Sequence, residues 1–173
     1  MAKSSQPDPT PFSFAASLIA RRARSVAEVR RALEKKFPGS EAIEPSIARL
    51  RELGYLDDRK FACQYASFLA RRRGFGPGRV RLELKSRLVD YHEIDEALQQ
   101  AYEDLSERSL LERALDKKLR TLRLPLTRRR FYSLAQSISR LGFPSDDIMK
   151  AMRSRPELKP VSNDTEPGSG QSM

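Results

Sequence analysis

The chain has 173 residues, of which 39% are hydrophobic, a composition that suits a short array of small units better than one large compact core. Lysine and arginine outnumber aspartate and glutamate by 33 to 23, and the resulting net charge of +10 predicts attraction to nucleic acid, acidic protein or an anionic membrane surface. No apolar run approaches the roughly 18 residues that a transmembrane helix needs, so a membrane-spanning protein is excluded.

The two ends of the chain, residues 1–13 and 156–173, are rich in proline and small polar residues and poor in apolar ones. Burial cannot offset the entropy lost on ordering such segments, so both are predicted to be disordered. The N-terminus also lacks the basic start and apolar stretch of a secretory signal, and the single cysteine, Cys63, cannot form an internal disulfide. We therefore expect a cytoplasmic protein.

Between these ends, apolar residues recur three and four positions apart and never alternate for long, so an all-α fold of about nine helices is predicted. Ser25 and Glu28 have the spacing of a capping box, and Asp57 is placed to cap a later helix. Glycines expected in the left-handed conformation at helix ends are Gly54, Gly74 and Gly142. Prolines expected at helix starts are Pro77, Pro125 and Pro144.

An internal repeat is the most informative feature of the sequence. Apolar residues stand at offsets 0, 4, 14 and 18 in three copies, which are Val29, Leu33, Ile43 and Ile47, then Val80, Leu84, Ile94 and Leu98, then Leu134, Ile138, Ile148 and Met152. Each copy predicts a helical hairpin with one shared apolar seam, because such spacings place side chains on one helix face. A preceding helix supplies Phe14, Tyr65 and Leu119, each fifteen positions before its copy's first seam residue.

The repeat predicts three three-helix units, over residues 14–56, 57–105 and 106–155. Each is too small to be secure alone, so neighbouring units should stack into an elongated array, straight or curved. The alternative is a single irregular helical bundle in which the periodicity is accidental.

Positive charge gathers in the second and third units. The residues predicted to bind a partner or nucleic acid are Arg71, Arg72, Arg73, Arg79, Arg81, Lys85, Lys117, Lys118, Arg128, Arg129 and Arg130. Residues 89–107 contain seven acids and no lysine or arginine, so the predicted surface is discontinuous. The alternative is a solvated helix face whose arginine stems cover apolar surface.

Aromatic residues stand beside these basic runs, at Phe75, Phe131 and Tyr132. Their rings could stack on nucleobases. Each also falls near a predicted seam, so packing in the core is the favoured interpretation.

Catalytic chemistry is not predicted. His92 is the only histidine and lies in the acidic stretch, so neither a nucleophile set nor a multi-histidine metal site can be assembled. Cys63 falls on a predicted buried face, where cysteine acts as a small apolar residue. The acidic pairs at positions 57–58 and 146–147 stand at helix starts, where capping and the helix dipole explain them. We expect a binding protein with no catalytic residue, metal ligand or cofactor.

Three stretches resemble the RecX family: LGYLDD at residues 53–58 with the following RKFA, GFGPGRVRLEL at 74–84, and RLGF at 140–143. Their order and spacing across residues 14–153 are far more specific than one motif. The resemblance implies three three-helix repeats in an elongated, curved protein. Leu88 stands where family members usually have glycine, and residues 37–39 also depart from the pattern, so both turns are expected to differ.

The resemblance also implies a function. Members of the RecX family bind RecA in the groove of its filament on single-stranded DNA and restrain filament growth, ATP hydrolysis, strand exchange and coprotease activity. Some bind DNA directly. For this chain the resemblance thus implies a monomer that modulates RecA in DNA repair, homologous recombination and the SOS response, with single- or double-stranded DNA as a further partner. The alternative is a basic helical-repeat protein that binds DNA or RNA without RecA.

Overall fold

A computed structural model of the chain describes residues 10–160. This part of the chain contains α-helices and one short 3-10 helix but no strand, and the all-α prediction is confirmed. The helices are α1 (Pro11–Arg21), α2 (Val26–Lys36), α3 (Ile43–Glu52), α4 (Asp58–Arg73), α5 (Pro77–Ser86), α6 (Tyr91–Tyr102), α7 (Glu107–Leu119), α8 (Arg128–Ser139), α9 (Ser145–Arg153) and η1 (Pro156–Leu158). None of these helices is both long and apolar enough to cross a bilayer.

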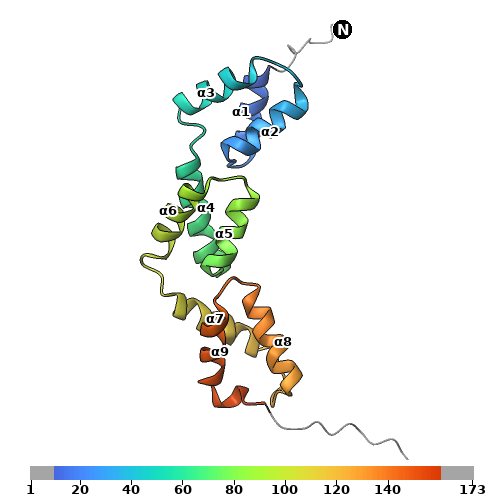
Figure 1. The fold of residues 1–173 in the computed structure, drawn as a ribbon, viewed down its shortest axis with the longest axis vertical. Helices are drawn as coiled ribbons and strands as arrows, with labels where there is room; N and C mark the ends of the chain where they lie inside the picture. The colour runs from blue at the N-terminus through green and yellow to red at the C-terminus, as the bar shows by residue number, and fades with distance from the viewer. Residues whose placement is uncertain (1–9, 161–173) are drawn as a thin grey trace, which may run out of the picture.

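The helices form three successive groups along the long axis of the molecule (Figure 1). We call them unit 1 (α1–α3), unit 2 (α4–α6) and unit 3 (α7–α9 with η1). Each unit has its own cluster of buried apolar residues, and the result is an elongated body with three separate cores.

The seam of the repeat forms the centre of each core. All twelve predicted seam residues are buried, and none is more than 8% exposed. Phe14, Tyr65 and Leu119 on the first helix of each unit are partly buried against the same clusters. The repeated spacing therefore reflects the packing of these side chains in the three cores, and the alternative of accidental periodicity is wrong.

Both ends of the described chain are more ordered than the sequence predicts. Helix α1 begins at Pro11 because the side chain of Thr10 accepts a hydrogen bond from the Ser13 backbone N–H at 3.2 Å. At the other end, η1 places Leu158 fully inside the core of unit 3. Leu158 thus anchors a segment whose composition predicts disorder, together with Arg155, which pairs with Glu112 and Asp116 on α7. The remaining predicted disorder, at residues 1–9 and 161–173, lies outside the described residues.

The predicted helix ends agree with the structure except at one proline. Ser25 and Glu28 form the capping box, and Asp57 accepts from the Lys60 backbone N–H at 2.9 Å. The three predicted glycines have φ of 73°, 67° and 91°. Pro125, however, lies in the loop before α8, because Thr127 supplies the cap and the helix begins at Arg128.

The turn between α5 and α6 keeps the left-handed conformation although it lacks glycine. Leu88 has φ of 60°, and Gly142, at the same offset in unit 3, has φ of 91°. The expectation that this turn would differ is therefore wrong. Val89 and Phe143, the next residues in the two turns, are both buried, and this anchoring holds Leu88 in a conformation that costs about 1–2 kcal/mol.

Neighbouring units meet through equivalent positions of the repeat. The Ser25 hydroxyl of unit 1 donates to the carbonyl oxygen of Arg87 in unit 2 at 2.5 Å. The Gly76 backbone N–H of unit 2 donates to the carbonyl oxygen of Leu141 in unit 3 at 2.7 Å. Both donors lie four residues before their unit's first seam residue, and both acceptors lie seven residues after theirs. The stacking of units is thus itself repeated.

The two junctions use different chemistry. At the junction of units 1 and 2, Glu28 accepts hydrogen bonds from Arg22 at 2.9 Å and from Arg87 at 3.1 Å. At the junction of units 2 and 3, two backbones touch, and a Cβ on Gly76 would lie 2.6 Å from the carbonyl oxygen of Gly142. The first junction depends on charged side chains, and the second on glycines that leave no room for a side chain.

Candidate functional site

The arginines at positions 71–73 form the last turn of α4, which Gly74 ends in the left-handed conformation. All three side chains are exposed. Cations at this end of a helix interact favourably with its dipole. Within residues 10–160, no acidic side chain forms an ion pair with any of the three, so their charge is open to a partner.

The other predicted binding residues of unit 2, all on α5, are already engaged within the unit. Arg79 pairs with Glu83 at 2.6 Å, and Arg81 pairs with Asp95 at 2.6 Å. The ammonium of Lys85 lies 4.9 Å from the ring centroid of Tyr91. The structure therefore separates the predicted cluster into two ion-paired arginines on α5 and three arginines on α4 that have no ion pair within residues 10–160. Lys85 and Arg73 each lie beside an aromatic ring.

The pair of Arg81 with Asp95 is part of the repeat. In unit 1, Arg30 and Glu44 occupy the same offsets, and their side chains meet at 2.7 Å. In each case one helix of the hairpin supplies the arginine and the other supplies the carboxylate. Unit 3 has Ala135 and Met149 at these positions, both packed against its core. The recurrence indicates that Arg81 pairs within its hairpin as Arg30 does in unit 1.

In unit 3, the predicted cations come from two helices that face a common groove. Lys117 and Lys118 lie near the end of α7, and the arginines at positions 128–130 form the first turn of α8, all of them exposed. The groove has a volume of about 550 Å³. Its lining residues are Lys118, Thr121, Leu122, Arg123, Arg130, Ser133, Leu134 and Ser137.

Sequence reasoning missed part of this groove. Arg123, which belongs to the loop between α7 and α8, was not among the predicted binding residues, and neither were Thr121, Ser133 and Ser137. The acid-free run between Asp116 and Asp146 was the available signal for Arg123. The hydroxyls carry no such signal, because serine and threonine are common on any exposed helix.

The aromatic residues beside the basic runs divide between core and surface. Phe75 is partly buried, with the guanidinium groups of Arg73 and Arg79 at 6.0 and 5.8 Å from its ring centroid. Phe131 is buried, but Tyr132 is 53% exposed, so the prediction of core packing was wrong for Tyr132. The reason is geometric, since Tyr132 lies on α8 two residues before the seam residue Leu134 and points away from the seam.

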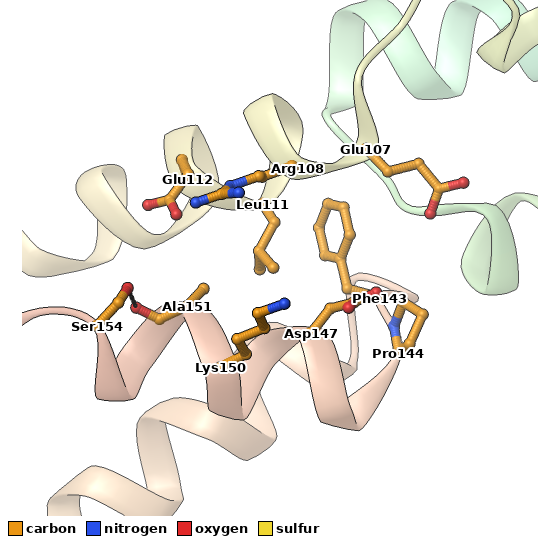
Figure 2. A pocket seen from close by; sticks show the side chains of 10 residues that line it. All are labelled: Glu107, Arg108, Leu111, Glu112, Phe143, Pro144, Asp147, Lys150, Ala151 and Ser154. Atoms are coloured by element: carbon orange, nitrogen blue, oxygen red, sulfur yellow. Dashed lines mark hydrogen bonds between the residues drawn. The ribbon is translucent and has the colours of Figure 1, made fainter.

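A second hollow, of about 200 Å³, lies between α7 and α9 of unit 3. Figure 2 shows the side chains of Leu111 and Lys150 reaching into the space between the two helices. Its lining residues are Glu107, Arg108, Leu111, Glu112, Phe143, Pro144, Asp147, Lys150, Ala151 and Ser154. Charges of both signs stand around an apolar floor, and the lining traced by the described residues includes neither histidine nor cysteine.

Cys63 and His92 stand apart from both hollows. Burial raises the pKa of the partly buried Cys63 thiol, which makes it a poor nucleophile. His92, Glu93 and Glu96 bring one ligand atom each within 4.8 Å of one another. His92 is exposed, and Arg59 already pairs with Glu96 at 2.9 Å. Arg59 therefore already supplies a cation beside these two partly buried carboxylates.

The acidic pairs at helix starts have structural roles. Asp57 caps α4, as predicted. Asp58 reaches across the junction of units 1 and 2, where its carboxylate accepts from the Val26 backbone N–H at 2.8 Å, and burial raises its pKa. Asp146 and Asp147 lie in the first turn of α9, where their negative charges interact favourably with the helix dipole, as predicted.

Comparison with known proteins agrees with the repeat architecture. A family model described as "RecX, second three-helix domain" matches residues 57–98, which cover most of unit 2. A solved structure of the regulatory protein RecX superposes with a TM-score of 0.72 at 23% identity, covering 84% of this chain and 72% of that one. RecX from Lactobacillus salivarius superposes with a TM-score of 0.64 at 20% identity, covering 83% and 93%.

Sequence relatives extend the match over nearly the whole chain. The regulatory protein RecX of Pelodictyon phaeoclathratiforme is 33% identical over 159 residues, which are 92% of this chain and 96% of the relative. That of Chlorobaculum tepidum is 40% identical over 111 residues, covering 64% and 67%. That of Bacillus subtilis is 34% identical over 147 residues, covering 82% of this chain but 53% of the relative. This chain belongs to the RecX family of regulatory proteins.

Proposed function

We propose that this protein binds RecA and its filaments on DNA and restrains their recombinase, ATPase and coprotease activities. Membership of the RecX family supports the role. The observation that carries it is the set of open arginines at positions 71–73, presented on an elongated body (Figure 1). Several weak contacts made by one molecule combine into a strong one when their spacing matches the partner.

Binding without catalysis is the activity proposed here, in the cytoplasm and by a monomer. Cys63 and His92 line neither of the two hollows of unit 3. The regulatory family and the all-helical fold support the same interpretation. Neither a cofactor nor a metal is needed for this role.

The ATPase of RecA on single-stranded DNA tests the proposal. Substoichiometric amounts of the protein should depress ATP turnover, because one bound molecule affects several subunits of a filament. Turnover that stays constant across a wide titration would contradict the proposed function.

A variant with Arg71→Glu, Arg72→Glu and Arg73→Glu tests the surface. We expect at least about a tenfold rise in the concentration needed for half-inhibition, since three open charges are reversed. The control carries Arg31→Glu, Lys35→Glu and Lys36→Glu on α2, which are also exposed and change the net charge equally. If both variants need the same higher concentration for half-inhibition, the effect comes from net charge and not from this surface. Unlike Arg79 and Arg81, the three α4 arginines can be changed without breaking an ion pair.

The second candidate function is binding to DNA or RNA without RecA, favoured by the groove of unit 3 with its several cations. It predicts tight binding to naked nucleic acid with a steep dependence on salt. The same samples that enter the ATPase titration can be measured against a labelled oligonucleotide. Tight binding with no effect on RecA would favour this second function.

A further inference from the structure

We infer that a groove at the junction of units 1 and 2 is a docking site for an acidic segment of a partner protein, one that presents an apolar side chain beside carboxylates. We call it the junction groove. Phe61, Tyr65 and Phe68 on α4 form its apolar wall, and Arg22 and Arg87 also line it. The proposal goes beyond modulation of RecA, because it assigns a second surface with its own ligand chemistry, and it stands whichever protein is the partner.

The apolar wall of the junction groove is a stripe of aromatic side chains on α4. Positions 61, 65 and 68 are four and three residues apart, so their side chains lie on the same face of the helix. Phe61 and Tyr65 are stacked, with their ring centroids 5.7 Å apart. The groove that they line together with Phe68 has a volume of about 310 Å³, which is enough for a large apolar side chain.

Phe68 is the member of the stripe that the fold does not require. Its side chain is 50% exposed and is not part of the core of unit 2, whereas Phe61 is buried in that core. The repeat does not call for an aromatic residue here, because the equivalent position of unit 1 is the exposed Ser17, also twelve residues before the first seam residue. A half-exposed phenylalanine that lines a groove is typical of a protein-binding surface.

The cations of the junction groove outnumber the carboxylate that pairs with them. Arg22 and Arg87 both hydrogen-bond to Glu28, at 2.9 and 3.1 Å, so two positive charges share one negative charge. Burial and the guanidinium groups of Arg22 and Arg87 also lower the pKa of the neighbouring Arg24, as expected where positive charge is in excess. A carboxylate from a partner would balance the second guanidinium.

The aromatic stripe continues along α4 to the open arginines. Arg72 stands four residues after Phe68 and eleven after Phe61, so it lies on the same face, about 16 Å along the helix axis from Phe61. Arg72 is exposed and has no ion pair within residues 10–160. A partner segment lying along α4 can therefore place an apolar side chain in the groove and a carboxylate at each end.

A protein segment fits the junction groove better than a nucleic-acid strand does. Stacking on bases needs an open ring face, but Phe61 is buried, and the ring of Tyr65 already contacts Phe61 and the guanidinium of Arg87, which lies 5.2 Å from its centroid. A phosphate backbone also needs several unpaired cations in a row. Both cations of this groove are bound to Glu28, whose own charge repels phosphate.

The test measures binding of a fluorescent peptide to the full chain at about 0.1 M salt. The peptide has about twelve residues, with a central Leu-Phe pair flanked by glutamates, a length that spans the stripe and Arg72 when helical. We expect saturable binding, and binding at least about tenfold weaker for a peptide with Ser-Ser in place of Leu-Phe. No binding of the first peptide, or equal binding of the two, would overturn the proposal.

Phe68→Ala tests the wall of the junction groove. It should weaken the Leu-Phe peptide at least about fivefold, because it removes the exposed ring that lines the groove. The control is Leu82→Ala on α5, which truncates a side chain of similar exposure outside the groove and should leave binding within about twofold. Equal losses in the two variants, or none at Phe68, would contradict the proposal.

A labelled oligothymidine distinguishes a protein-docking groove from a nucleic-acid surface. Phe68→Ala should leave its affinity within about twofold, because the junction groove has no open ring face for a base beyond that of Phe68 and no unpaired cation. If the oligothymidine loses as much affinity as the peptide does, the assignment to a protein segment is wrong.

A second variant keeps every ring and every cation. Gln64 is exposed and lines the junction groove, so Gln64→Glu adds a carboxylate there and should weaken the acidic peptide by about fivefold or more through repulsion. The matched change Gln99→Glu, at an exposed position of α6, should leave binding within about twofold. Unchanged binding by the Gln64 variant would overturn the proposal even if the Phe68 variant folded poorly. None of these measurements contains RecA, so failure of this proposal and failure of the RecA proposal give different results.

Discussion

The two junctions between units use equivalent positions of the repeat, but the first is made by polar side chains and the second by backbone atoms. Between units 1 and 2, charged and hydroxyl side chains make the contact, with Glu28 held by Arg22 and Arg87. Between units 2 and 3, Gly76 and Gly142 bring two backbones together. A contact between side chains responds to salt, pH and rotamer changes, whereas a contact between backbones does not. We therefore expect any bending of the array to concentrate at the first junction.

The largest expected effect comes from filling the second junction. Gly142→Ala puts a Cβ 2.1 Å from the backbone nitrogen of Arg79, at a residue with φ of 91°. The free energy of unfolding should fall by about 3 kcal/mol, from strain and overpacking together. Urea unfolding followed by circular dichroism measures the loss.

Gly39→Ala is the matched control for this prediction. Gly39 has a φ of 74°, but its Cβ would meet nothing within 4 Å. The Gly39→Ala variant should therefore lose only about 1 kcal/mol of its free energy of unfolding, the cost of the left-handed backbone conformation. Equal losses at the two glycines would show that the close approach contributes nothing.

The next largest effect concerns the charged junction. Glu28→Gln leaves Arg22 and Arg87 without their carboxylate and should cost about 1–2 kcal/mol at pH 7. The pKa of Glu28 is lowered although burial opposes the shift, because Arg22, Arg87 and the Ser25 backbone hydrogen-bond its carboxylate. Its contribution is therefore present above the ordinary pKa near 4.5 and is lost as pH falls below it.

The pH dependence of unfolding between pH 3 and 7 tests this assignment. As the pH falls from 7 to 3, the free energy of unfolding should decrease less in the Glu28→Gln variant than in the parent protein. Glu52→Gln, which breaks the exposed pair with Arg49, serves as the comparison and should change stability by less than about 0.5 kcal/mol. Identical acid profiles for the parent and the Glu28 variant would contradict the role given to this junction.

The smallest expected effect is a gain. Leu88→Gly should raise the free energy of unfolding by about 1 kcal/mol, because glycine adopts φ of 60° without strain and Leu88 is partly exposed. Leu82→Gly on the exposed face of α5 should instead cost about 1 kcal/mol. Thermal unfolding of the two variants should therefore shift in opposite directions. A loss at Leu88 would show that its side chain contributes more than its backbone conformation costs.

Much of the fold could be predicted because equivalent positions of the sequence repeat are buried in the core of each unit. A residue such as Ile94 is buried for the same reason as Ile43 and Ile148, so one period predicts three cores. The order of η1 could not be predicted from composition, since it depends on the burial of Leu158 and on the ion pairs of Arg155 with α7. The position of Pro125 depended on a loop whose path is set by contacts within unit 3.

The candidate site was predictable only in part. Clustering of arginines in the sequence shows where charge lies, but it does not show which charges are already paired. The engagement of Arg79 by Glu83 follows the i,i+4 rule and was accessible from the sequence. The pair of Arg81 with Asp95 was also accessible, from its equivalence to Arg30 and Glu44. The groove of unit 3 could not be predicted from the sequence, because Arg123 lies in an irregular loop whose path the sequence pattern does not show.

The equivalence of the two junctions also bears on the length of the array. In units 1 and 2, the position four residues before the first seam residue hydrogen-bonds to the next unit, and in unit 3 that position is Arg130. A fourth unit docked in the same manner would have to bury this guanidinium. Helical arrays end in repeats with a polar outer face. The start of α8 therefore carries an exposed guanidinium at the position that contacts the next unit in units 1 and 2.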